Sequence, residues 1–536
     1  MSYNFYGFIR YTIIGAMLFL LSACSDFLSS IRNENNQSIE SLLYNLSDLD
    51  VCVNGAYGAF SSNLYFGTLA LSQMLGSDEI TNTLNTTVIP DFSGKNTLNY
   101  FFNYNCNYDD YQAGILMQWT SFVNNNCNVV IQSIEKELPT LKTKNDSLNA
   151  DRLLGEAFLM RATCEFYNNF YIGRQFHVST LNSPSTLYRK KPILSFEDMP
   201  EPRKTVAQVY RFVIDDLKQA EILIPEKFDK SIHPTAYQFR CKRNVATAML
   251  AKVYFQKNDF DSALIYVNKL LGNTKGSSTL FPLQSGTSYA RLFQIVDKTN
   301  FQAGNNSEII MGFHGNSAFL PTISSRWNGF QWTAFKNLQN GDVTQSKFRL
   351  VIDSSLVIRM LQGDTSMDVR FRQMMYVTRN QGKEAPAGQW TTLKYAYPTS
   401  NIIWLRAAEF HLMRAEIYVH INKLQDAVSE LNLIRARAGL DEIGNGISKN
   451  SLMKTIIDER SRELCFENVR RWDNLRLASL SDSPVAEYLP EPYKSGFIPM
   501  GNRKINTAES LIHWNNNRLY CLIPENEYLY NTALER

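Results

Sequence analysis

The chain has 536 residues, of which 44% are hydrophobic and 20% are charged, so it is too long for one small module and can bury a large core. Lys and Arg number 54 against 51 Asp and Glu, and this near balance leaves no strong field to attract nucleic acid. Aromatic residues make up 12% of the chain in company with many asparagines, which favours sugars or peptides as ligands because aromatic faces and amide groups suit neutral polar molecules.

The N-terminus has the features of a secretory signal. Arg10 precedes an apolar stretch at residues 11–21, which is shorter than the ~20 residues that a membrane-spanning helix needs. Residues 21–24 read Leu-Ser-Ala-Cys and resemble the lipobox of bacterial lipoproteins, in which the cysteine becomes the first mature residue and carries acyl chains. We therefore expect residues 1–23 to be a lipoprotein signal peptide and Cys24 to be the lipid anchor.

Metal and cofactor sites are not indicated. Of the eight cysteines, seven follow Cys24 without forming a CxxC pair, and the six histidines are scattered, so neither a disulfide framework nor a zinc site is predicted. Asp78 and Glu79 are adjacent acids, but two acids do not supply the six oxygens that calcium needs. His411 and His420 are nine residues apart on one predicted helix and are expected to be surface or hydrogen-bonded core residues. We assign no metal and no cofactor.

Helical periodicity dominates wherever the pattern is clear. Apolar residues at three- and four-residue steps predict amphipathic helices over residues 124–138 and 151–171. Thr205 is a candidate N-cap for a third helix over residues 206–223, which Pro225 ends.

Two distant segments share one signature, an Ala, a Tyr three residues later and an Ala nine residues after that. These residues are Ala251, Tyr254 and Ala263 in the first copy and Ala415, Tyr418 and Ala427 in the second. The spacing resembles the tetratricopeptide helix–turn–helix, in which small residues let antiparallel helices approach closely. Asn258 and Asn422 follow the first helix of each copy and predict the turns. Two copies so far apart imply a helical scaffold with a long insertion of loops and short strands.

Several motifs then appear in a fixed order. Residues 156–162 read Glu-Ala-Phe-Leu-Met-Arg-Ala, residues 405–416 read Leu-Arg-Ala-Ala-Glu-Phe-His-Leu-Met-Arg-Ala-Glu, residues 458–467 read Asp-Glu-Arg-Ser-Arg-Glu-Leu-Cys-Phe-Glu, residues 470–476 read Arg-Arg-Trp-Asp-Asn-Leu-Arg and residues 522–524 read Leu-Ile-Pro. Together with the lipobox they resemble the SusD/RagB family of outer-membrane nutrient-binding lipoproteins.

This resemblance implies an all-α fold of tetratricopeptide-like helix pairs that support a loop-rich, aromatic-rich half with short strands. It also implies capture of oligosaccharide, or in some members peptide, and its delivery to a partner TonB-dependent barrel of the SusC type. We expect one SusD-like domain over residues 24–536. Its helical scaffold is expected mainly at 40–60, 115–271 and 402–478, and its loop-rich insertions at about 61–114 and 272–401.

Charges in the motif at residues 458–467 do not indicate catalysis. Glu459, Glu463 and Glu467 lie one helical turn apart with arginines among them, which indicates helix-surface or partly buried ion pairs. A catalytic acid/base pair needs two different environments on either side of a substrate. No Walker sequence or GxSxG motif occurs, so we expect the protein not to be an enzyme.

Two segments combine aromatic and amide residues. Residues 100–111 and 326–332 place aromatic rings beside Asn, Gln and Arg, so that rings can cover the apolar faces of a sugar while the polar groups bond its hydroxyls. The alternative is that these rings pack the loops onto the scaffold. The residues expected to bind ligand are Tyr100, Asn103, Tyr104, Arg326, Trp327 and Trp332.

The sequence therefore predicts a lipid-anchored, glycan-binding protein at the outer surface of the outer membrane. Peptide capture is the alternative within the same family. A secreted glycoside hydrolase and a scaffold that binds only proteins remain as rivals from other classes.

Overall fold

Two units divide the chain, residues 1–49 and residues 50–536, and nearly all of the described residues belong to the second. The computed structural model describes residues 45–61, 74–82, 104–108, 110–137, 143–276, 280–290, 292–294, 307–313, 350–361, 368–377, 390–392, 394, 402–501 and 511–534.

Helices dominate the described chain. The longer ones are α3 (Leu46–Ala59), α6 (Asp110–Glu137), α7 (Lys144–Ile172), α8 (Val206–Leu223), α9 (Arg243–Gln256), α10 (Phe260–Leu271), α16 (Ala407–His420), α17 (Leu424–Arg437), α18 (Lys449–Glu463) and α19 (Arg470–Ala478). The shorter ones are α11 (Gly286–Ala290), α14 (Ser354–Leu361), α15 (Val369–Met374) and α20 (Glu525–Tyr530).

The strands are short and pair antiparallel in twos. They are β1 (Ile80–Asn82) with β3 (Leu350–Ile352), β2 (Ile309–Phe313) with β6 (Ile402–Arg406), β4 (Met375–Val377) with β5 (Trp390–Thr392), and β7 (Phe497–Ile498) with β8 (Ile512–His513). No described strand exceeds five residues, which confirms the all-α fold class. The described part of residues 272–401 also contains the short helices α11, α14 and α15, where the sequence predicted loops and strands.

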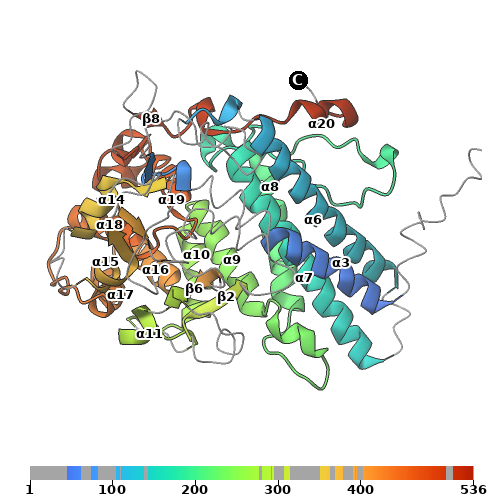
Figure 1. The fold of residues 1–536 in the computed structure, drawn as a ribbon, viewed down its shortest axis with the longest axis horizontal. Helices are drawn as coiled ribbons and strands as arrows, with labels where there is room; N and C mark the ends of the chain where they lie inside the picture. The colour runs from blue at the N-terminus through green and yellow to red at the C-terminus, as the bar shows by residue number, and fades with distance from the viewer. Residues whose placement is uncertain are drawn as a thin grey trace, which may run out of the picture. The chain divides into compact units, whose positions relative to one another are not determined.

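Neighbouring helices stack in sequence order. Helix α7 packs against α6 and α8, α9 against α8 and α10, and α16 against α10, α17 and α18 (Figure 1). In the first pair, Asn124 on α6 lies 2.5 Å from Glu165 on α7, and Asn128 lies 2.6 Å from Arg161. Residue numbers therefore rise along α6 as they fall along α7, so the two helices are antiparallel. This stack of helix pairs is the predicted tetratricopeptide-like scaffold.

Local chemistry explains where these helices begin, end and meet. Thr205 caps α8 as predicted, in a reciprocal arrangement where its side chain accepts from the backbone of Gln208 and the Gln208 side chain accepts from the backbone of Thr205. Asn258 and Asn422 adopt left-handed conformations, with φ of 61° and 60°, and turn the chain between the helices of each predicted repeat. Gly155 lets α7 approach the end of α8, because a Cβ there would lie only 2.8 Å from a side-chain carbon of Ile224.

The repeat signature lies in the core, as predicted. Its four alanines are fully buried, and Tyr254 and Tyr418 are 8% and 4% exposed. Small residues at these positions bring α9 to α10 and α16 to α17, which explains why the two copies keep the same spacing.

Two sequence-based expectations for the first helix pair need correction. The helix predicted from residue 124 begins 14 residues earlier, at Asp110. Helix α7 is not amphipathic, because its charged residues Arg152, Glu156, Arg161 and Glu165 are buried with its apolar ones. Arg152 pairs with Glu156 within the helix, whereas Arg161 finds its partner on another helix and donates to both carboxylate oxygens of Asp216 on α8 at 2.7 and 2.9 Å.

None of the described helices combines the length and the apolar character that crossing a lipid bilayer requires. The signal segment and Cys24 lie outside the described residues.

Candidate functional site

Of the six predicted ligand-binding residues, one lies in the described part of the chain and five lie outside it. Tyr100, Asn103, Arg326, Trp327 and Trp332 lie outside the described residues. Tyr104 is described, and the expectation that it binds ligand is wrong, because its side chain is fully buried. It lies in the hydrophobic core cluster together with Trp514, Leu519 and Tyr520. The packing alternative therefore holds for this ring.

The ladder β1–β3 joins the two segments that carry the other predicted residues. Asn82 at the end of β1 pairs with Leu350 at the start of β3. The segment 83–103 leaves the ladder at Asn82, and the segment 314–349 enters it at Leu350. One end of the stretch 83–103 and one end of the stretch 314–349 therefore meet at the same residue pair of the ladder, although residues 82 and 350 are far apart in sequence.

The remaining ends of both segments are also attached to the core. Phe313, the last residue of β2, pairs with Ile402 and stacks on Trp404 with ring centroids 5.8 Å apart. At the end of the first segment, the Asn105 side chain accepts from Arg518 at 2.7 Å, beside the buried Tyr104. All four ends are therefore positioned by packed structure.

A buried carboxylate fixes the ladder to the scaffold. Asp78, two residues before β1, is fully buried and accepts from Arg470 on α19 at 2.7 and 2.8 Å. Arg359 on α14, the helix that follows β3, lies 2.9 Å from the same carboxylate. Burial alone would raise the pKa of Asp78, but these two guanidinium groups hold it below its usual value.

Glu79, the residue between Asp78 and β1, makes further contacts to the backbone of neighbouring elements. Its carbonyl accepts from the Asp353 backbone at 2.9 Å, and its side chain accepts from the Phe466 backbone at 3.0 Å. Burial raises the pKa of Glu79 to about 7. The oxygens of Asp78 and Glu79 thus bond to protein donors. The sequence does not indicate this role, because Asp78 and Arg470 are 392 residues apart and an isolated acidic residue gives no sign of a distant partner.

The charged motif at residues 458–467 is buried more deeply than expected. Glu459 and Glu463 are at most 1% exposed, so the prediction of surface or partly buried ion pairs is wrong about location although right about pairing. Glu463 lies 2.7 Å from Arg406 and 2.6 Å from Arg437. The same network includes Glu308, Asp368, Arg370, Lys394, Arg435, Arg462 and Glu467.

This network links β2, α15 and β6 to α17 and α18 by charge pairing. Burial alone would raise the pKa of Glu459, but Arg370 and Arg462 lower it to about 2. The pKa of Glu463 is also held well below its usual value, since Arg437 and Arg406 outweigh the effect of burial. These carboxylates stay ionised near neutral pH, so they do not act as general acids there.

The two motif histidines are hydrogen-bonded inside the core. His411 lies 2.7 Å from Glu430, and His420 lies 2.9 Å from the Tyr488 hydroxyl.

Across the described ranges, no group of His, Cys, Asp or Glu is arranged to hold a metal ion. Six of the seven cysteines after Cys24 are buried, and Cys52 is partly exposed.

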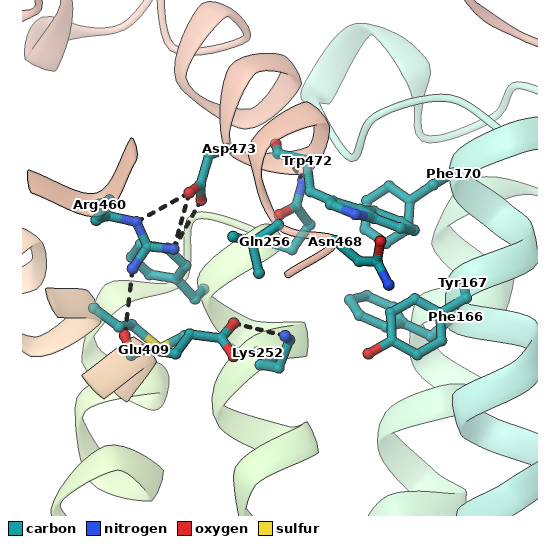
Figure 2. Close-up of a pocket in the computed structure, with 13 residues that line it drawn as sticks. Phe166, Tyr167, Phe170, Lys252, Gln256, Glu409, Arg460, Asn468, Trp472 and Asp473 are labelled. Atoms are coloured by element: carbon teal, nitrogen blue, oxygen red, sulfur yellow. Dashed lines mark hydrogen bonds and ion pairs between the residues drawn. The ribbon is translucent and has the colours of Figure 1, made fainter. Parts of the chain in front are cut away.

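A small cavity lies among α7, α9, α16 and α19 (Figure 2). Figure 2 shows two ion pairs on its wall, Lys252 with Glu409 and Arg460 with Asp473, and the ring of Trp472 beside Phe170. Its volume is about 30 Å³, whereas pockets for small organic ligands measure about 300–1,000 Å³. This cavity is too small to hold a sugar ring.

Comparisons with known proteins agree with this architecture. A model of the SusD family matches residues 286–535, and a family model described as starch-binding associating with outer membrane matches residues 64–255. The SusD-like protein P38 of Formosa agariphila is 21% identical over 392 residues, which cover 67% of this chain and 72% of that protein.

Solved structures show the same fold. A SusD superfamily protein from Bacteroides thetaiotaomicron matches with a TM-score of 0.71 and 18% identity, covering 92% of this chain and 99% of that one. Surface glycan-binding protein A from Bacteroides uniformis matches with a TM-score of 0.62 and 19% identity, covering 91% of this chain and 98% of that one. The stacked helix pairs, the ordered motifs and the two family models together show that this chain belongs to the SusD family.

Proposed function

We propose that this protein binds carbohydrate at the outer membrane and delivers it to a partner TonB-dependent transporter. Membership of the SusD family supports this, as do a matching family model described as starch-binding and a structural neighbour named as a surface glycan-binding protein. The observation that carries the proposal is the β1–β3 ladder, where Asn82 pairs with Leu350 and so brings together one end of each of the stretches 83–103 and 314–349, which contain the proposed ligand residues.

The ligand site is proposed to lie in those two segments. Trp327 and Trp332 provide rings for the apolar face of a sugar, and Tyr100 adds a third ring from the other segment. Arg326 and Asn103 donate hydrogen bonds to hydroxyl groups. Tyr104 is left out because it is buried in the core.

Binding without bond cleavage is the proposed mode of action. Glu459 and Glu463 of the family motif are paired with arginines in the core, whereas glycoside hydrolysis needs two carboxyl groups facing each other across the sugar. The protein is proposed to hold a glycan tightly enough to retain it and loosely enough to release it to the transporter.

Titration of the purified protein with candidate glycans, chosen from an array screen, tests this function. Trp327→Ala and Trp332→Ala are measured beside Tyr530→Ala, a control that removes an aromatic ring which is 61% exposed on α20. We expect at least one Trp variant to bind ~1–3 kcal/mol more weakly, as for an aromatic hot spot, with an unchanged melting temperature. The control should bind normally.

Two outcomes would redirect the proposal. If both Trp variants melt early, or if both bind glycan like the wild type, the segment 326–332 is not the site and Tyr100 and Asn103 become the next variants. If peptide displaces the glycan or binds in its place, the protein is a peptide-capturing member of the family.

A further inference from the structure

The stretch 314–349 is attached at its two ends to two different ladders. It leaves β2 after Phe313 and enters β3 at Leu350. Strand β2 pairs with β6, whereas β3 pairs with β1, and these two pairs are separate sheets among the described strands. Strand pairing in the described chain therefore does not fix how far apart the two ends of this stretch lie.

The loop between α18 and α19, residues 464–469, bonds to both ladders. Glu467 accepts from Arg406, the last residue of β6, at 2.6 and 2.8 Å. The backbone N–H of Phe466 donates to the carboxylate of Glu79 at 3.0 Å, and Glu79 directly precedes β1. Two consecutive residues of one short loop thus contact the β2–β6 ladder and the start of the β1–β3 ladder.

This loop has a backbone conformation that needs support from its surroundings. Phe466 and Asn468 both have a φ of 61°, in the left-handed region that residues other than glycine adopt at a cost in energy. The buried Glu79 carboxylate holds the N–H of Phe466, and the buried Lys394 ammonium donates to the Cys465 carbonyl at 3.1 Å. Contacts from outside the loop therefore maintain its shape.

Glu79 is bonded to the β1–β3 ladder through its backbone as well. Its carbonyl accepts from the N–H of Asp353 at 2.9 Å, and the next residue, Ile80, pairs with Ile352 on β3. Its side chain thus contacts the loop 464–469 while its main chain is part of the junction with the ladder. A displacement of the loop is transmitted to the ladder through a single residue.

We propose that the loop 464–469 sets the spacing between the two ends of the stretch 314–349, and that Glu79 is the positioning residue that connects this loop to the β1–β3 ladder. Arg326, Trp327 and Trp332 lie in that stretch, so the spacing also governs the proposed ligand site. This consequence for the ligand rests on the proposed function, whereas the connection between the two ladders does not.

Amide hydrogen exchange of the full chain tests the connection without a ligand. Glu79→Met keeps a side chain of similar length but removes the acceptor for Phe466, so peptides from both ladders should exchange roughly tenfold faster. Glu165→Met is the matched control. Glu165 is also buried and accepts from Asn124, but it lies on α7, so its loss should leave the relative exchange of the two ladders unchanged even where it lowers overall stability.

A conservative variant identifies the bond that matters. Glu79→Gln keeps an oxygen that accepts from the Phe466 N–H, so both ladders should exchange as in the wild type. Faster exchange of Glu79→Met in the β1–β3 ladder alone, or in neither ladder, overturns the proposal, and so does a Glu79→Gln protein that behaves like Glu79→Met. If Glu79→Met does not fold, Glu467→Gln weakens the loop's bond to Arg406 instead and should also speed exchange in both ladders.

Glycan titration of the same variants separates this inference from the proposed function. Glu79→Met should bind glycan roughly tenfold more weakly, because the ligand segment loses its preorganised spacing, whereas Glu165→Met should bind normally. If both ladders exchange faster while glycan affinity stays unchanged, the ladders are connected as inferred and the ligand site does not lie in the stretch 314–349. If the wild type binds no glycan, the proposed function fails and the exchange measurement still decides the inference.

Discussion

Buried glutamates in this fold differ in whether a cation lies close enough to keep them ionised. Glu165 on α7 accepts from Asn124, and burial raises its pKa to about 7. Glu416 on α16 is equally buried, but Arg476 lies 2.7 Å away and outweighs the effect of burial, lowering the pKa to about 2. The contribution of Glu165 to stability therefore falls as the pH rises from about 4.5 to about 7, whereas the contribution of Glu416 increases as the pH rises from about 2 to about 4.5.

Glu165→Gln should change the pH dependence of unfolding. A carboxyl group whose pKa rises on folding binds its proton more tightly in the folded state, so its contribution to stability falls as the pH rises from about 4.5 to about 7. Gln does not titrate, so the variant should gain about 3 kcal/mol relative to the wild type between pH 4 and pH 8. Denaturant melts across this range measure the difference.

Glu416→Gln is the matched control for that measurement. Its carboxyl group titrates near pH 2 when folded and near pH 4.5 when unfolded, so the difference between this variant and the wild type should stay constant from pH 5 to pH 8. A constant difference for Glu165→Gln over the same range would show that its pKa is not raised.

Helix pairs are the elements whose packing the sequence specified most directly. Ala415 on α16 is fully buried between paired helices, so Ala415→Trp should force them apart and cost ~1–3 kcal/mol or more. Gln425→Trp, at an exposed position of the neighbouring α17, should stay within about 0.5 kcal/mol of the wild type. A neutral Ala415→Trp in thermal melts would contradict the assigned helix pair.

The β1–β3 ladder depends on a charge pair that lies outside the strands. Asp78→Asn keeps the size of the side chain but leaves Arg470 and Arg359 without their buried counter-charge, which should cost about 3–5 kcal/mol. Because the ladder anchors both proposed ligand segments, glycan affinity should fall as well. Urea denaturation and glycan titration measure the two effects.

Asp482→Asn is the control for the ladder variant. Its carboxylate is 61% exposed and pairs with His177, so removing its charge should leave stability within about 1 kcal/mol of the wild type. An Asp78→Asn protein with normal stability and normal glycan binding would show that this charge pair does not position the ladder.

At the scale of the whole molecule, the N-terminal cysteine should decide where the protein resides. Cys24→Ala removes the thiol that the lipobox Leu-Ser-Ala-Cys presents for acylation, so the variant should be exported without a lipid anchor and leave the membrane fraction. Mass spectrometry of the wild-type N-terminus should find acylated Cys24. An unmodified mature chain that begins at another residue would contradict the lipoprotein assignment.

Local patterns were sufficient for the scaffold. The Thr205 cap, the turns at Asn258 and Asn422 and the buried alanines of the repeat all result from contacts between residues close in sequence, and such contacts leave a regular spacing that can be read directly. The family motifs likewise indicated the all-α fold class, which the structure and the family models confirm.

Only the tertiary structure decided which polar and aromatic residues face the interior. Helix α7 reads as amphipathic in sequence, yet its charges are buried because partners such as Asp216 arrive from other helices. Tyr104 looked like its aromatic neighbours but packs in the core. Asp78 gave no signal at all, since its partner Arg470 is 392 residues away. Burial and long-range ion pairing depend on how distant elements pack together, so no local pattern in the sequence predicts them.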